Sequence, residues 1–163
     1  MDLEEFKAMW DEEGKKPEGA VKCLIIAALE TVKEENPDGK KMWGMVLPED
    51  EVDENGELGM TQTQELALEE FSRQVDGTDF KGGIAASYLG GTPDNGYAYS
   101  YDNKIVVDTK QTKRGKTETK LFVRSGGKDN ASPVLLTVND DGYWKINEYS
   151  SLFTGVKPIE TGA

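Results

Sequence analysis

The chain has 163 residues, enough for one domain with a hydrophobic core, and its apolar share of 36% and aromatic share of 9% are those of a folded protein. It contains no histidine and one cysteine, Cys23, which excludes an internal disulfide and the usual thiol–imidazole pair of cysteine catalysis. The same scarcity of nitrogen and sulfur ligands predicts no transition-metal site. We expect no cofactor.

The net charge of −12 is unevenly distributed along the chain. Residues 1–80 carry 22 acidic and 8 basic side chains, whereas residues 81–163 carry 9 and 11. The acidic half would repel a phosphate backbone, so we expect no nucleic-acid partner. We expect a protein or small-molecule partner of unknown identity, and a monomer or a weak homodimer. The difference in charge between the two halves of the chain would suit head-to-tail contact between molecules, but a solvated acidic face is the simpler interpretation.

The sequence shows neither a membrane span nor a targeting segment. Its longest apolar stretch, around residues 24–29, is far shorter than the roughly 18 residues of a membrane helix. The acidic start over residues 1–5 is unlike a signal or transit peptide. We therefore expect no membrane association and a cytoplasmic location, although a leader removed in processing would leave no trace here.

Two helices are predicted in the first third of the chain. Asp2 is the expected N-cap of a helix over residues 3–11, with Glu5 three positions later as a capping-box partner. A second helix begins at Pro17, and Asn-Pro-Asp-Gly at residues 36–39 ends it. Its apolar residues follow helical spacing: Val21, Leu24, Ile25, Ala28, Leu29 and Val32. Cys23 falls inside this stretch, so we interpret it as a core thiol.

The next segment is predicted to be rich in loops, from residue 40 to about residue 60. A third helix is expected over residues 63–75, where Thr61 and Gln64 have the spacing of a capping box. The acidic run over residues 51–62 partly matches a calcium loop. However, Gln62 stands where such a loop needs a bidentate carboxylate, so a solvated loop is the preferred interpretation.

The pattern changes to strand-like alternation after Gly77. We expect a short helical or strand piece at residues 84–89, then strands at 97–101, 104–108, 117–124, around 134–138 and at 143–149. Trp144 is in phase with Ile146 on the last strand, so we expect it to be buried against the helices. The alternative places Trp144 on an open face with the tyrosines.

Helices that precede strands favour an α+β fold over alternating βαβ units. We expect one domain over residues 1–163, mainly helical over 1–80 and mainly strands over 81–163. The helices should cover one face of a curved, mainly antiparallel sheet of about four strands. This arrangement is similar to the cone-shaped cystatin and nuclear-transport-factor-two folds at the level of architecture.

Candidate binding residues come from two features of the second half. Tyr97, Tyr99 and Tyr101 alternate and would form an aromatic platform, although cross-strand core packing is the commoner use. A basic stretch also spans residues 110–128 and would suit an acidic partner or a phosphate, with protection of a strand edge as the simpler interpretation. From this stretch we select Arg124, Ser125 and Lys128 as ligand-binding candidates.

No catalytic residue is assigned from the motifs. Ser125 and Lys128 fit the Ser-x-x-Lys spacing, but Gly126-Gly127 lies between them and favours a loop over the helix that this motif requires. Gly115-Lys116-Thr117 matches the tail of a phosphate loop, but Lys110 replaces the required glycine.

The C-terminal half resembles an uncharacterised bacterial domain family. The resemblance rests on a Ser-Gly-rich loop ending in Ser132-Pro133, then Trp144, then Glu-x-Ser-Ser-Leu at residues 148–152, with Leu-Gly-Gly-Thr-Pro at 89–93 upstream. It implies a fold and no activity. We therefore expect a non-enzymatic binding or interaction domain. The alternative is a small-ligand hydrolase or isomerase of a cone-shaped fold that uses Asp, Glu or Tyr.

Overall fold

The computed structural model describes residues 1–159 and has an α+β fold, as predicted. The last four positions of the predicted domain, 160–163, lie outside the described residues. The α-helices are α1 (Leu3–Glu13), α2 (Pro17–Val32), α3 (Gly39–Val46), α4 (Gln62–Phe71) and α5 (Gly83–Ala86). The strands are β1 (Glu118–Val123), β2 (Ser132–Val138) and β3 (Trp144–Glu148), and short 3-10 helices lie at Glu49–Glu51, Pro93–Asn95 and Ser150–Phe153 (η1, η2 and η3).

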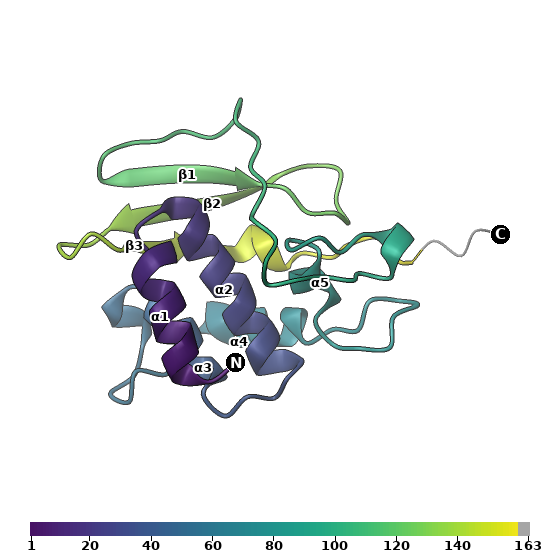
Figure 1. Ribbon diagram of the computed structural model, residues 1–163, viewed down its shortest axis with the longest axis horizontal. Helices are drawn as coiled ribbons and strands as arrows, with labels where there is room; N and C mark the ends of the chain where they lie inside the picture. The colour runs from purple at the N-terminus through teal and green to yellow at the C-terminus, as the bar shows by residue number, and fades with distance from the viewer. Residues whose placement is uncertain (160–163) are drawn as a thin grey trace.

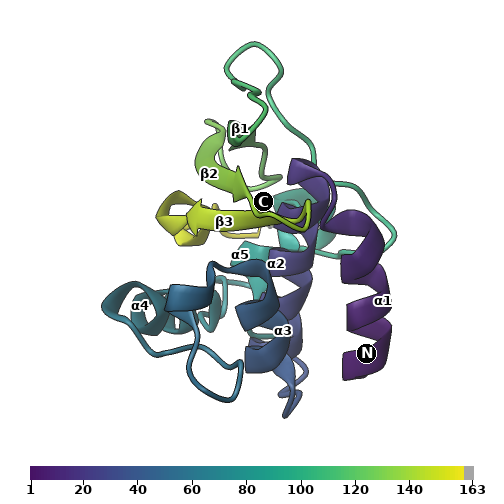
Figure 2. The ribbon, with the colours of Figure 1, turned by 90° about the vertical axis from the view of Figure 1, so that its left-hand side faces the viewer.

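Helix α2 is the centre of the molecule. It contacts α1, α3, α4 and α5 and also the sheet through β1 and β3 (Figures 1 and 2). Its apolar residues surround the helix rather than forming one stripe, and Leu24, Ile25 and Cys23 are all fully buried. This burial agrees with the core position predicted for Cys23. It also raises the pKa of the Cys23 thiol to about 12, because the thiolate would lose its hydration.

The sheet is antiparallel with strand order β1-β2-β3, and it lies on one side of the helices (Figure 1). Leu121 lies opposite Val134, and Leu136 lies opposite Ile146, so alternate residues turn their side chains toward the helices. The register shifts at Leu135 and Leu136. With three strands the sheet is smaller than expected, and the comparison with the cystatin and nuclear-transport-factor-two folds is not confirmed.

Two predicted strands are wrong. Residues 97–101 form turns and irregular backbone, beginning at Tyr97, whose φ of 61° lies in the left-handed region. Residues 104–108 run beside β1 with one isolated bridge, between Val107 and Val123. The alternating tyrosines at residues 97–101 therefore do not lie in a strand. Tyr97 is instead fully buried, where it packs on Gly127.

The loop predicted after residue 40 is also wrong, because it contains helix α3. Gly39 and Gly44 lower the helical propensity of this segment, but Met42, Trp43 and Val46 are fully buried. Packing against α2 therefore outweighs the weak local preference. The following acidic loop closes on itself, with Asp53 Oδ1 accepting from the amides of Asn55 and Glu57.

Trp144 is only partly buried, so the prediction that it is buried against the helices is wrong in degree. Its backbone N–H donates to the Gly14 carbonyl at 2.8 Å, which joins β3 to the turn between α1 and α2. The predicted phase is correct, because Ile146, on the same face, is 1% exposed and lies in the core. Trp144 also packs against the core.

Candidate functional site

The Gly-rich loop that follows β1 is built by close backbone contacts. A Cβ atom at Gly126 would lie 2.1 Å from the Gly91 carbonyl oxygen, and one at Gly127 would lie 2.5 Å from the Tyr97 hydroxyl. Ser125 supports the same loop, since its Oγ lies 2.7 Å from Ser87 Oγ and accepts from the Gly127 amide. The backbone of this loop passes so close to Gly91 and Tyr97 that only glycine fits at positions 126 and 127.

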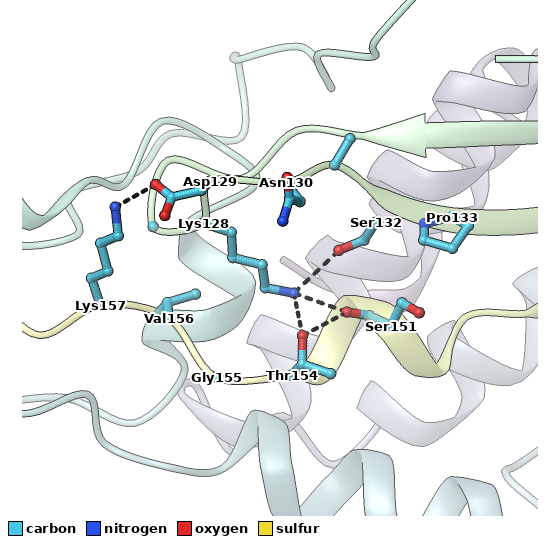
Figure 3. Close-up of a pocket in the computed structure, with 12 residues that line it drawn as sticks. Lys128, Asp129, Asn130, Ser132, Pro133, Ser151, Thr154, Gly155, Val156 and Lys157 are labelled. Atoms are coloured by element: carbon cyan, nitrogen blue, oxygen red, sulfur yellow. Dashed lines mark hydrogen bonds and ion pairs between the residues drawn. The ribbon is translucent and has the colours of Figure 1, made fainter. Parts of the chain in front are cut away.

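This loop carries Lys128 into a ring of oxygen atoms (Figure 3). Its Nζ lies 2.8 Å from Tyr88 Oη, 2.7 Å from Thr154 Oγ1 and 2.8 Å from the Ser151 carbonyl oxygen. A fourth oxygen, Ser132 Oγ, lies at 3.2 Å. The amine thus joins the Gly-rich loop to the segment that follows α5, to the start of β2 and to η3.

The amine of Lys128 has neutral oxygen partners and no ion pair with a carboxylate among residues 1–159. Burial lowers the pKa of Lys128 to about 8, because the ammonium form loses hydration. The nearest carboxylate in sequence, Asp129, pairs with Lys157 at 2.5 Å. The site therefore holds a partly desolvated cation whose charge no described side chain neutralises.

A pocket of about 480 Å³ opens beside this amine. Its walls are residues 127–131 of the loop, residues 132 and 133 at the start of β2, and residues 151 and 154–157 beyond β3, and we call it the Lys128 pocket. Asn130 and Ser132 supply polar groups, while Pro133 and Val156 supply apolar surface (Figure 3). This size is within the range of small-molecule sites, and the mixed lining is typical of them.

Of the five other predicted site residues, Tyr97 is buried against Gly127, and the remaining four lie at two other pockets. Arg124 and Ser125 line a separate pocket of about 530 Å³, where Arg124 pairs with Asp108 at 2.8 Å. Tyr99 and Tyr101 line a third pocket, of about 400 Å³. The structure does not bring Ser125 Oγ to Lys128, so the loop interpretation of Ser-x-x-Lys is confirmed.

The tyrosine pocket contains a buried carboxylate, Glu30. Tyr101 Oη donates to it at 2.6 Å and Asn36 Nδ2 donates at 2.9 Å. Burial alone would raise the pKa of Glu30, but these hydrogen bonds, together with the chain's amino group, lower it below its usual value. Tyr99 instead accepts from Lys33 at 2.8 Å. Tyr99 and Tyr101 thus serve as partners of charged groups.

The basic stretch is divided between ion pairs and solvent. Arg114 makes two hydrogen bonds to the Glu18 carboxylate, at 2.8 and 2.9 Å, and so fastens the loop before β1 to helix α2. Lys110, Lys113, Lys116 and Lys120 are exposed. Within residues 1–159, no group of three or more His, Cys, Asp or Glu side chains is placed to hold a metal ion.

Sequence reasoning missed Tyr88, Ser132, Ser151 and Thr154, which surround Lys128. Tyr88 gave no local signal, because its role depends on a contact 40 positions away. The other three lie in or beside segments that carry the family resemblance, the Ser-Gly-rich loop ending in Ser132-Pro133 and the Ser-Ser-Leu segment. The fold brings these segments together at the Lys128 pocket.

Fold and site together define an α+β domain with a lysine-centred surface pocket. None of its described helices is both long and apolar enough to cross a membrane. Residues 1–160 match the family described as "Domain of unknown function (DUF6935)", and the chain belongs to that family. The match confirms the resemblance to an uncharacterised domain family. Comparisons with curated proteins and with solved structures give no match.

Proposed function

We propose that this protein is a non-enzymatic binding domain that takes a small anionic molecule in the Lys128 pocket. One observation carries the proposal, namely that the partly buried Lys128 ammonium is surrounded by neutral oxygens and is not paired with a described carboxylate. A cation held away from water is costly unless a negative charge approaches it. A bound anion would supply that charge.

The lining of the pocket supports the choice of a small molecule over a broad protein surface. Asn130 and Ser132 can hydrogen-bond a carboxylate or a tetrahedral oxyanion beside Lys128, and a lysine accepts either as a point charge. Pro133 and Val156 would contact an apolar part of the same molecule. The Lys157–Asp129 pair lies in the pocket wall and leaves Lys128 as the central cation.

An enzyme that uses Asp, Glu or Tyr is less well supported. Its best candidate is Glu30 with Tyr101, the buried carboxylate of the tyrosine pocket. Hydrogen bonds lower the pKa of Glu30, whereas a general acid at neutral pH requires a raised one. Glu30 is better suited to hold its neighbours in place than to transfer a proton.

Amide-resolved NMR titration tests the proposal with two probes, sodium acetate for a carboxylate and sodium sulfate for a tetrahedral oxyanion. Sodium chloride at the same ionic strength is the reference for screening. We expect saturable shifts confined to residues 127–133 and 151–157, with the stronger response identifying the preferred anion.

The matched variants are Lys128→Met, which keeps the aliphatic chain, and Lys120→Met, which removes an exposed lysine. Lys128→Met should abolish the saturable shifts, and Lys120→Met should preserve them. Identical titrations of the wild type and Lys128→Met would overturn the proposal. So would shifts that sodium chloride reproduces.

A further inference from the structure

We propose that Ser132 is an acylation site, with its hydroxyl activated by the neutral amine of Lys128. The inference goes beyond the proposed function and rests on it for one point, that small molecules enter the Lys128 pocket. Both side chains line this pocket, and Ser132 Oγ lies 3.2 Å from Lys128 Nζ (Figure 3). An amine at this distance from a hydroxyl can take its proton.

The hydrogen bonds around the amine single out Ser132 among its neighbours. Tyr88 Oη donates to the Leu152 carbonyl at 2.6 Å, and Thr154 Oγ1 donates to the Ser151 carbonyl at 3.0 Å. Each of these hydroxyls therefore uses its proton on a carbonyl and can only accept from Lys128. The Ser132 hydroxyl accepts from Lys128 and donates to Tyr88, and no carbonyl in the described chain accepts its proton, so that proton can turn from Tyr88 to a free lone pair on Lys128.

The protonation state of Lys128 decides what Ser132 does. The ammonium has three N–H groups, and the three nearer oxygens, at 2.7–2.8 Å, accept all of them. The neutral amine has two N–H groups and a lone pair. Ser132 is then the neighbour with a proton to donate to that lone pair, which makes its oxygen nucleophilic.

The acylation step is balanced with an activated ester as the co-reactant. Ser132 Oγ forms a bond to the acyl carbon, the bond from that carbon to the leaving oxygen breaks, and Lys128 Nζ takes the serine proton. The products are an O-acyl serine, a lysine ammonium and the released alcoholate. Asn130, whose side-chain amide lines the same pocket, is placed to donate to the acyl oxygen (Figure 3).

The step should depend on pH through Lys128. Burial lowers the pKa of this amine to about 8, so raising the pH through that value increases the neutral form. The other titratable groups nearby are Tyr88, whose pKa burial raises well above its usual value, and the Asp129–Lys157 pair.

The experiment uses p-nitrophenyl acetate on the whole protein, with the site of acetylation read by peptide mass spectrometry. Alkaline hydroxylamine removes an acetyl ester from serine but leaves an acetyl amide on lysine. We expect one hydroxylamine-sensitive acetyl group on Ser132, formed at a rate that rises with a midpoint near the Lys128 pKa of about 8. Ser132→Ala should remove it.

Lys128→Met and Lys128→Arg should both slow acetylation of Ser132 on the order of 100-fold, because neither side chain can act as a base at this pH. Lys128→Arg keeps the positive charge, so it tests the role of Lys128 as a base if Lys128→Met does not fold. Lys120→Met and Ser150→Ala, which alter exposed residues outside the pocket lining, should react like the wild type.

Acetylation of Lys128 in place of Ser132 would overturn the inference, as would a Ser132 rate unaffected by Lys128→Arg. The outcome is separate from that of the anion titrations. Acetylation of Ser132 without saturable acetate or sulfate binding would sink the proposed function and keep this inference. Anion binding with an inert Ser132 would do the reverse.

Discussion

The Nζ of Lys128 lies 2.8 Å from the hydroxyl oxygen of Tyr88, although 40 positions separate the two residues in the chain. Tyr88 follows helix α5, and Lys128 belongs to the Gly-rich loop after β1. Their contact fixes the amine at the edge of the core, where burial lowers its pKa. The same position leaves the amine beside a pocket that a small molecule can enter.

The first prediction concerns the pH dependence of stability that Lys128 creates. Its pKa is about 8 in the folded protein and 10.5 in an unfolded chain, so between these values the unfolded chain binds more protons. The contribution of this amine to the free energy of unfolding therefore rises as the pH increases through that window. Below about pH 8 the cost of burying the ammonium is fully present.

Urea denaturation of the wild type and Lys128→Met at several pH values measures this effect. The free energy of unfolding of the wild type minus that of the variant should increase between about pH 8 and pH 10.5. Burial also lowers the pKa of Lys145, but that residue is common to both proteins and cancels. A difference that stays flat across this range would contradict the prediction.

The second prediction concerns the two glycines that shape the pocket loop and its far wall. Gly126→Ala would place a Cβ 2.1 Å from the Gly91 carbonyl oxygen, so we expect it to destabilise the protein by about 1–3 kcal/mol. Gly155→Ala is the matched control, because no atom lies within 4 Å of its added Cβ. Thermal melts of the two variants provide the comparison, and equal melting temperatures would refute the close contact.

The third prediction concerns the core around α2. Leu24→Ala and Ile25→Ala should each lower the free energy of unfolding by about 2–5 kcal/mol, because both side chains are fully buried. Leu66→Ala is the control on a helix surface, since Leu66 is 47% exposed, and it should cost less than about 0.5 kcal/mol. Similar losses for all three variants, measured by urea denaturation, would disagree with the central position of α2.

The fourth prediction concerns the ion pair between Glu18 and Arg114. Hydrogen bonding from Arg114 lowers the pKa of Glu18, so the stability that this pair adds is lost as the pH falls through that lowered value. Both side chains are partly exposed, which limits the coupling free energy to about 0.2–1 kcal/mol. A double-mutant cycle with Glu18→Ala and Arg114→Ala measures it, and a coupling above about 2 kcal/mol would show that solvent does not screen the pair.

The sequence predicted the elements whose signals are local. The apolar spacing identified α2, and Thr61 with Gln64 correctly predicted the capping box, in which each side chain accepts from the other residue's amide. Asp2 was likewise correct as the N-cap of α1, since it accepts from the Glu5 amide at 2.8 Å. These interactions join residues three apart, so sequence spacing alone defines them.

The failures come from contacts between distant segments. Tyr97 alternates with Tyr99 and Tyr101 and was therefore predicted to lie in a strand. In the structure its hydroxyl donates to the Lys157 carbonyl, and its backbone follows η2, which Thr92 and Asn95 cap. Helix α3 was missed because burial of Trp43 against the core stabilises it. Lys128 was selected from sequence, whereas its ring of oxygens comes from three separate segments that only the fold brings together.

The most direct measurement is an NMR titration of the Lys128 side chain in protein labelled with ¹³C-lysine, assigned through Lys128→Arg. The pKa of Lys128 is recorded alone, with sodium acetate and with sodium sulfate, at matched ionic strength. We predict a pKa near 8 in the free protein and a higher one with the bound anion, because the anion stabilises the ammonium form. A pKa near the ordinary 10.5 that neither anion moves would contradict an anion-binding pocket at Lys128.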